Sequence, residues 1–208
     1  MYILELMRVV SKRVALFGPA GAGKTTLARN LADFKGGVML SFADALRAEY
    51  AKINRIPIAT LTTPPMKYNY RTGLQRLGDE RRAIDPYYWI NKLDAEIQRQ
   101  LSFGRRVFFV DDVRYRNEYD MLKDMGFTMV LVEGSPSKTV LTPEQAAHTS
   151  EQGWQQFEAD IVVPWNPNML RSIESEKKAV YERLALLYYK LDGEIVDWNR
   201  AQRARRNN

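Results

Sequence analysis

Cysteine is absent from the 208 residues, and histidine occurs once, as His148. Without cysteine the chain has no disulfide and no thiolate metal site, which fits a reducing compartment. A single histidine excludes any metal site built from several imidazole ligands. These two absences therefore exclude disulfide scaffolds and the common structural zinc centres.

Long hydrophobic runs are also missing. No stretch approaches the roughly 20 apolar residues that are needed to span a bilayer. Residues 1–10 contain Glu5 and Arg8 and lack the layout of a signal peptide. We therefore expect a cytoplasmic protein with no membrane partner.

The chain carries a net charge of +6, and four of its arginines fall within the last nine residues. Without those four charges the remaining chain carries +2, so its charge is nearly balanced. We expect residues 200–208 to form a disordered basic tail, and we expect no stable nucleic-acid partner. The composition, with 45% hydrophobic and 27% charged residues, is that of a globular protein.

Short apolar runs alternate with helical patterns along the chain, which predicts an α/β fold with a five-stranded parallel sheet and helices on both faces. The length suits one domain, which we place at 1–199. The predicted strands are Arg13–Phe17, Val38–Phe42, Val107–Val110, Phe127–Val132 and Asp160–Val163.

Apolar spacing of three and four residues predicts the intervening helices. Three prolines make Pro57–Asn69 irregular, and the polar stretch Gly134–Ala159 gives no clear assignment. Asn166-Pro167 opens a last helix with Leu187 on its inner face. The other predicted helices are Gly23–Phe34, Ala43–Ile53, Arg71–Arg82, Asp85–Ser102 and Asn117–Met125.

The most specific motif is Gly18-Pro19-Ala20-Gly21-Ala22-Gly23-Lys24-Thr25, which lies between the first strand and the first helix. It has the pattern G-x-x-x-x-G-K-[ST] of a phosphate-binding loop, in which backbone N–H groups and a helix N-terminus surround phosphate. We predict a P-loop NTPase fold that binds ATP, with Lys24 at the β- and γ-phosphates. The predicted ATP-binding residues are Gly18, Gly21, Ala22, Gly23, Lys24, Thr25 and Thr26.

The third predicted strand ends in Asp111-Asp112-Val113-Arg114. The carboxyl edge of a parallel sheet is where ligands of open α/β folds bind. We predict that Thr25 and Asp111 hold Mg²⁺, and that Lys24, Asp112 and Arg114 are catalytic. The pattern alone leaves open which aspartate serves the metal and which orients the attacking group.

Basic residues recur at helical spacing between the second and third strands, where they would clamp the phosphate of a second substrate. The alternative is a solvated helix face. Four aromatic residues are candidates for stacking on a base or for packing: Phe42, Tyr68, Tyr70 and Trp89. The basic helix carries Arg71, Gln75, Arg76, Arg81 and Arg82.

Several further segments occur in a characteristic order, and with the phosphate loop they resemble the bacteriophage deoxynucleoside monophosphate kinase family, including its T-even phage type. The resemblance extends from Val14 to Leu191. The segments are Tyr70-Arg71-Thr72-Gly73-Leu74-Gln75-Arg76-Leu77-Gly78, Asp85-Pro86-Tyr87-Tyr88-Trp89-Ile90, Asp111-Asp112-Val113-Arg114-Tyr115-Arg116-Asn117-Glu118, His148-Thr149-Ser150-Glu151, and Asp160-Ile161-Val162-Val163 with Asn166.

This resemblance implies a nucleoside monophosphate kinase-like fold and transfer of the ATP γ-phosphoryl group to a deoxynucleoside monophosphate, in the host cytoplasm if the protein is of phage origin. It also implies an acceptor-binding insertion at about 43–103 and a lid-like segment at about 134–159. Related kinases are found as dimers, so a homodimer stays open. The acceptor-binding residues that the resemblance implies are Phe42, Arg71, Gln75, Arg82, Trp89, His148 and Glu151.

The chain departs from the family pattern in two places. The family often has Gly-Thr-Glu or Gly-Thr-Asp where this chain has Gly78 followed by Asp79-Glu80. The segment before Asp85 is also shorter than in the T-even enzyme, which leaves open whether Arg81 or Arg82 has the acceptor-binding role. The lid-like segment contains no arginine. We therefore expect the transition-state charge to be neutralised by Lys24, Arg114, Arg116 and the helix that carries Arg71 to Arg82.

Three alternatives to an ATP- and Mg²⁺-dependent kinase of deoxynucleoside monophosphates remain at this point. One is a kinase of another small acceptor, such as a nucleoside or metabolite. A second is a nucleic-acid-stimulated ATPase that uses the basic tail. The third, a nucleotide-binding protein without catalysis, is disfavoured by the intact Lys24, Thr25 and Asp111/Asp112.

Overall fold

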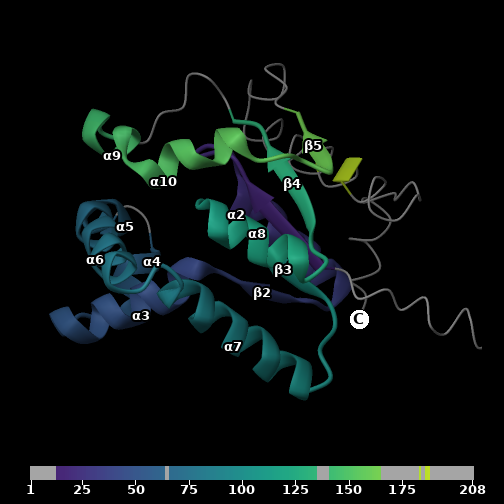
Figure 1. Cartoon of the computed structure of the whole chain (residues 1–208), viewed down its shortest axis with the longest axis horizontal. Helices are drawn as coiled ribbons and strands as arrows, with labels where there is room; N and C mark the ends of the chain where they lie inside the picture. Colours follow the sequence, from purple (N-terminus) through teal and green to yellow (C-terminus); the bar gives the residue numbers. More distant parts are fainter. Residues whose placement is uncertain (1–12, 64–65, 135–140, 165–182, 184–185, 188–208) are drawn as a thin grey trace, which may run out of the picture.

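The computed structural model describes residues 13–63, 66–134, 141–164, 183 and 186–187. These residues form a five-stranded sheet in the order β2-β3-β1-β4-β5, in which every pair of neighbours is parallel. The sheet confirms the predicted fold class (Figure 1). The strands are β1 (Arg13–Phe17), β2 (Val38–Leu40), β3 (Phe108–Val110), β4 (Thr128–Val132) and β5 (Ile161–Val163).

Alternate residues of β1 face two separate hydrophobic clusters, because successive side chains of a strand point to opposite faces. Val14 and Leu16 pack with helix α2 (Lys24–Lys35). Ala15 and Phe17 lie on the other face, which α7 (Tyr88–Ser102) and α8 (Arg116–Asp124) cover. Burial on both faces explains why the strands read as continuous apolar runs.

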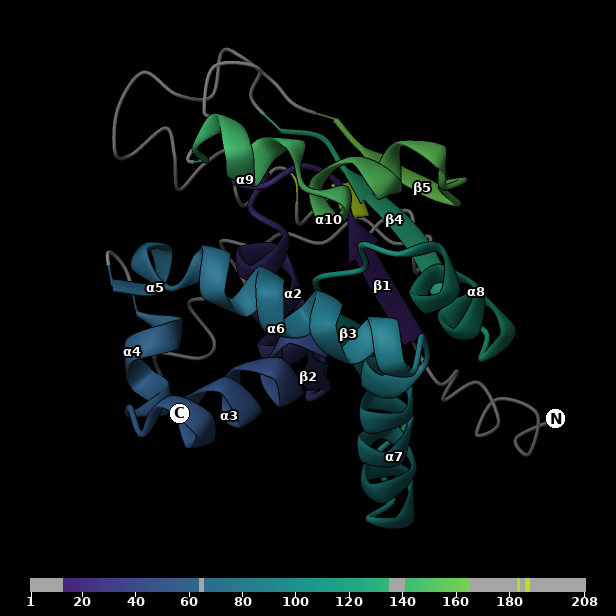
Figure 2. The same cartoon turned by 60° about the vertical axis from the view of Figure 1, so that its left-hand side comes forward.

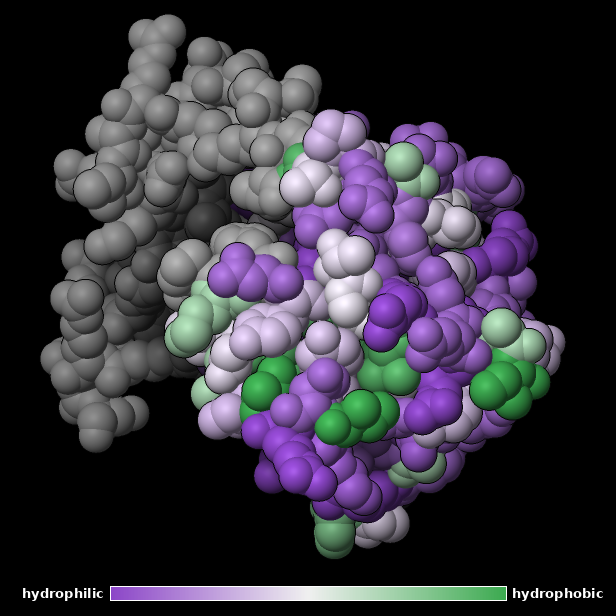
Figure 3. Space-filling view, turned by 90° about the vertical axis from the view of Figure 1, so that its left-hand side faces the viewer, coloured by the Kyte–Doolittle hydropathy of each residue, from purple (hydrophilic) through white to green (hydrophobic). Residues whose placement is uncertain are grey.

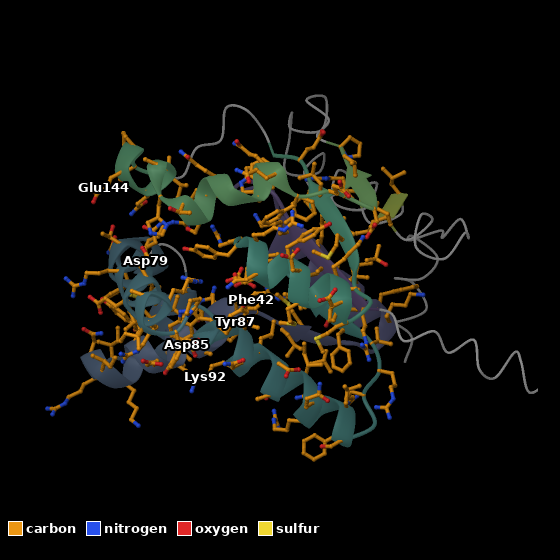
Figure 4. The ribbon with its side chains drawn as sticks, viewed as in Figure 1. Phe42, Asp79, Asp85, Tyr87, Lys92 and Glu144 are labelled. Carbon is orange, nitrogen blue, oxygen red and sulfur yellow. The ribbon has the colours of Figure 1, made fainter. Side chains whose placement is uncertain are left out.

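The second strand is shorter than predicted. It ends at Leu40, Ser41 is the N-cap, and Phe42 already begins helix α3 (Phe42–Asn54). The apolar side chain of Phe42 suits either element, so hydrophobicity alone could not locate the boundary. Phe42 is buried and lies near the middle of the molecule in Figure 4.

The segment Pro57–Asn69 is not irregular throughout, as the prolines suggested. It contains two short helices, α4 (Ile58–Thr62) and α5 (Met66–Asn69). Pro57 precedes α4 as its N-cap with φ of −62°, because the proline ring fixes a torsion that suits a helix start.

Helix α6 (Arg71–Ile84) follows, and α7 begins three residues after Asp85. The Asp85 carboxylate accepts the Tyr87 N–H at 2.9 Å, although Tyr87 rather than Asp85 is the N-cap. The polar stretch Gly134–Ala159, which the sequence pattern left without a clear assignment, contains two short helices and a 3-10 turn. These are α9 (Pro143–Ala147), α10 (Thr149–Gln152) and η1 (Gly153–Gln156).

The helices outside the sheet layers form two groups. In Figures 1 and 2, α3 to α6 lie together on one side, and α9 and α10 lie above them. Figure 3 shows this side of the molecule as mostly hydrophilic, with hydrophobic residues scattered across it. Within the part of the chain that the structure describes, no helix is long and apolar enough to cross a membrane.

Some predictions fall outside the described residues. These are the absence of a signal at 1–10, the helix start at Asn166-Pro167 and the basic tail 200–208. Leu187, predicted for the inner face of that last helix, is described and fully buried in the cluster that contains α2.

Candidate active site

The phosphate loop leaves the buried end of β1 and enters α2. Gly18, Gly21 and Gly23 have φ of 127°, 77° and 88°, values that side chains other than glycine rarely allow. At Gly18 an added Cβ would also lie 2.4 Å from the Val132 carbonyl oxygen. The glycines are therefore needed for the path of the loop, which ends at the free N–H groups of the first turn of α2.

Lys24, the first residue of α2, folds back over this loop. Its Nζ donates to the carbonyl oxygens of Gly18 and Pro19, both at 2.7 Å. Burial, together with the charge of Arg114, lowers the pKa of the Lys24 ammonium to about 7. The amine thus lies inside the loop, next to where the loop would hold phosphate.

Thr25 and Asp111 form the part of the site that suits a metal. The Thr25 hydroxyl is hydrogen-bonded to the Asp111 carboxylate, whose Oδ1 is buried and has no hydrogen-bond partner among the described residues. Burial and the negative charge of Asp112 raise the pKa of Asp111 to about 6. A hydroxyl and a carboxylate oxygen without a partner fit Mg²⁺, which takes few protein ligands and keeps water or phosphate oxygens.

Asp112 has a different environment. Its Oδ2 accepts the Ser41 hydroxyl at 2.6 Å and the Ala43 N–H at 2.9 Å, and its Oδ1 accepts the Phe42 N–H at 2.9 Å. The carboxylate therefore caps the N-terminus of α3, where negative charge is favoured. The two neighbouring aspartates are thus distinguished: one lies beside Thr25 and the other holds a helix.

All seven residues that the resemblance assigned to the acceptor line one cavity between α3, α6, α7 and the segment 148–151, which we call the acceptor cavity after that assignment. Arg114, from the loop after β3, lines it as well. The predicted residues in the lining are Phe42, Arg71, Gln75, Arg82, Trp89, His148 and Glu151.

Two arginines of this cavity converge on one carboxylate. Arg71 Nη2 and Arg114 Nη1 both donate to Glu151 Oε1, and Arg114 Nη1 also donates to the Ser150 carbonyl at 3.1 Å. The Glu151 side chain is only 5% exposed. An anionic group is therefore already held between two guanidinium groups.

Arg82 lies further along the same cavity. Its guanidinium stacks over the Tyr115 ring at 3.8 Å, and its Nη2 donates to Glu118 Oε1 at 3.2 Å. Burial raises the pKa of Glu118 to about 7. Arg81 pairs instead with Glu49 and is absent from the cavity lining, so the structure answers which of the two adjacent arginines faces the cavity.

The other cavity residues differ in what they can offer a ligand. Trp89 is buried and its indole N–H donates to the Gly78 carbonyl at 3.1 Å, so it supports the wall. Gln75 Nε2 is buried without a hydrogen-bond partner in the described structure, so it is a donor available to a ligand. Tyr70 packs edge-on against Tyr50, and the side chain of Tyr68 is outside the described part.

The lid-like segment contacts α6 through polar side chains. His148 Nε2 lies 2.8 Å from Asp79 Oδ2, and Gln145 Nε2 donates to the Thr72 hydroxyl at 3.4 Å. In Figure 4, Asp79 lies beneath α9, which carries Glu144. The segment therefore closes one side of the acceptor cavity, although it has no arginine.

The phosphate loop and the acceptor cavity are adjacent. A second cavity is lined by most of the loop, from Ala20 to Thr26 without Ala22, and shares Arg71, Asp112 and Arg114 with the acceptor cavity. Arg47 of α3 lines both cavities and was missed from the sequence, where it reads as an exposed partner of Asp44. Arg116, in contrast, pairs with Asp120 on an exposed surface and lines neither cavity.

Comparison with known proteins agrees with this architecture. A family model described as deoxynucleotide monophosphate kinase matches residues 16–176. A search of curated proteins finds no significant match. The matched region covers most of the chain and includes the phosphate loop, the loop after β3 and the acceptor cavity, in the P-loop kinase-like fold predicted from the sequence. The chain therefore belongs to the deoxynucleotide monophosphate kinase family and is a kinase.

Proposed function

We propose that the protein transfers the γ-phosphoryl group of ATP to a deoxynucleoside 5′-monophosphate in a Mg²⁺-dependent reaction. The single observation that carries this proposal is the junction of two cavities at Arg71 and Arg114, with the phosphate loop on one side. A donor and an acceptor phosphate could meet there, both in contact with the same cations.

On the donor side, the loop N–H groups and Lys24 would hold the β- and γ-phosphates. Lys24 Nζ now donates to two carbonyl oxygens, and phosphate oxygens are stronger acceptors for an ammonium. Thr25 and Asp111 would hold Mg²⁺, which when bound neutralises charge on the donor phosphates.

On the acceptor side, the proposal gives the phosphate the place of the Glu151 carboxylate between Arg71 and Arg114. Guanidinium groups bind phosphate with paired hydrogen bonds, and a dianion gains more from two cations than a carboxylate does. Gln75 Nε2 would supply a further donor. Phe42 and Trp89 would pack around the nucleoside.

In the transfer step, an oxygen of the acceptor phosphate bonds to the γ-phosphorus as the bond to the β–γ bridging oxygen breaks. ADP leaves, and the acceptor becomes a diphosphate. Positioning and charge neutralisation by Lys24, Arg71 and Arg114 would supply the catalysis. The closed lid-like segment would keep water from competing with the acceptor.

A coupled assay of ADP release tests the proposal. Each of the four natural deoxynucleoside monophosphates, their ribose counterparts and the corresponding nucleosides is offered with ATP, with Mg²⁺ or with EDTA. We expect turnover with one or more deoxynucleoside monophosphates, and its loss in EDTA. ADP release that responds to nucleosides, or to DNA without any small acceptor, would contradict the proposal and favour one of the alternatives.

A further inference from the structure

Arg183 is a buried arginine that lies behind the phosphate loop and is far from it in sequence. It is 8% exposed. Its Nη1 donates to the Ala22 carbonyl at 3.0 Å, and its Nη2 donates to the Glu133 carbonyl at 2.8 Å and approaches the Val163 carbonyl at 3.5 Å. One guanidinium thus joins the loop to the chain at the carboxyl ends of β4 and β5.

The surroundings explain how the side chain reaches this place. Leu187, four residues after Arg183, is fully buried in the cluster that contains α2 and β1, so the chain next to Arg183 is held against the sheet. Gly134 packs close to Pro19 in the loop, where an added Cβ would lie 2.8 Å from the proline ring.

The position of Arg183 gives it two means of affecting the loop. Its bond to Ala22 fixes the peptide plane just before Gly23, the N-cap of α2. Its charge also lies close to that helix start, because a Cβ added at Gly23 would be 4.0 Å from Arg183 Nη1. Arginine keeps its proton even when buried, so the guanidinium adds positive potential where phosphate binds.

We propose that Arg183 is a positioning residue for the phosphoryl donor: it orients the backbone of the phosphate loop through the Ala22 carbonyl and adds positive charge behind it. The inference rests on the proposed function, because it assumes that ATP binds in this loop. It predicts an effect on the donor alone, since Arg183 lines neither cavity and its contact with the site is with the phosphate loop.

Two substitutions and one matched control test this role. Arg183→Met keeps the apolar stem and removes the charge and all donors, whereas Arg183→Lys keeps the charge but loses the planar fork. Arg13→Met is the control. Arg13 is a partly buried arginine at the opposite end of β1 that donates to the Met125 carbonyl at 2.6 Å.

The measurements are the Kd for ATP by calorimetry, the KM values for ATP and for the acceptor, and the thermal midpoint of each variant. We expect Arg183→Met to raise the Kd and KM for ATP roughly tenfold or more, because small displacements of binding groups have effects of this size. The KM for the acceptor should change less than about twofold. Arg183→Lys should be intermediate, and Arg13→Met should lower the thermal midpoint only.

A purely structural role would give another result. If folded Arg183→Met binds ATP as the wild type does, or raises both KM values equally, the proposal is wrong. If Arg183→Met does not fold, Arg183→Lys decides: a selective rise in the KM for ATP supports the role, and wild-type constants overturn it. A wild-type protein that binds ATP but phosphorylates no monophosphate would instead contradict the proposed function, while the ATP Kd of the variants would still test Arg183.

Discussion

The proposed donor and acceptor sides of this site are built in different ways. The donor side comes mainly from one contiguous segment, residues 18–26, whose conformation is set by glycine torsions and by the start of α2. The acceptor side takes side chains from α3, α6, α7, the loop after β3 and the segment 148–151. Its arginines already hold carboxylates of the protein.

The donor would thus be bound by one contiguous segment, and the acceptor by side chains that come from distant parts of the chain. A phosphate loop uses backbone N–H groups, so most of its side chains contribute little and a single lysine carries its charge. The acceptor cavity contains buried side-chain ion pairs, which an anionic ligand would exchange for its own contacts. Substitutions should therefore act in opposite ways on the two sides. Loss of the Lys24 charge weakens interactions with the donor, whereas loss of the Glu151 carboxylate strengthens binding of the acceptor.

The largest effect is expected at Lys24. Lys24→Ala should reduce kcat by roughly a thousandfold, because removal of one group that stabilises developing charge costs this much in comparable sites. The fold should persist, since the loop path depends on glycines rather than on the lysine. Steady-state kinetics measures kcat, and circular dichroism shows whether the variant is folded. Lys52→Ala, at an exposed position of α3, serves as the control, and near-normal turnover of Lys24→Ala would refute its role.

A smaller effect is expected at Arg114, which both cavities share. Arg114→Ala should lower kcat roughly a hundredfold and raise the acceptor KM by a smaller factor, because the guanidinium would hold the bound acceptor phosphate and also act on the charge that develops in the transition state. Arg116→Ala is the matched control, since that side chain is 65% exposed and pairs with Asp120. A change in KM with kcat intact would make Arg114 a binding residue only.

Glu151 offers the sharpest contrast between the two sides. Glu151→Gln removes the negative charge that Arg71 and Arg114 share, so the acceptor phosphate meets less competition. We expect the acceptor Kd to fall roughly threefold to tenfold, as for loss of about 1 kcal/mol of competing ion pairing. Calorimetry with a deoxynucleoside monophosphate measures this change, and Glu144→Gln on the exposed face of α9 is the control. Weaker acceptor binding would show that Glu151 itself contacts the acceptor, as the family resemblance implied.

The smallest effect is expected at Asp79, which links α6 to His148. The Asp79 side chain is 52% exposed, and exposed pairs of this kind contribute less than about 1 kcal/mol. Asp79→Asn should therefore raise the acceptor KM about twofold and leave the KM for ATP unchanged. Glu80→Gln, at the neighbouring exposed position, should change neither constant. An equal change in both constants would mean that this contact does not act on the acceptor side alone.

The same division between local and distributed structure decides what the sequence could predict. The strands and the phosphate loop were predicted well, because apolar runs and glycine spacing act over a few residues. The end of β2 was missed because Asp112, 70 residues away from Phe42, caps the following helix. α9 and α10 were missed because their short polar turns lack apolar periodicity, and their caps come from Thr142 and His148.

The acceptor cavity was predicted only in part. Family resemblance assigned its residues, but only the folded structure pairs Arg81 with Glu49 and Arg82 with Glu118, since adjacent helix positions differ by about 100° in direction. Arg47 could not be recognised, because an arginine three residues from an aspartate on a helix is typical of a solvated surface. The role of Glu151 as the counterion of two arginines depends on contacts across 80 and 37 residues.

The adjacent carboxylates after β3 have a consequence for the spacing of the two substrates. Asp111 lies with Thr25 on the donor side, and Asp112 holds the start of α3, which forms part of the acceptor wall. Neighbouring Cα atoms are about 3.8 Å apart whatever the protein does. The Cα atoms that carry these two carboxylates therefore keep this separation whatever the surrounding helices do. In the proposed function, the wall that holds the donor and the wall that holds the acceptor would thereby be joined through a single peptide bond.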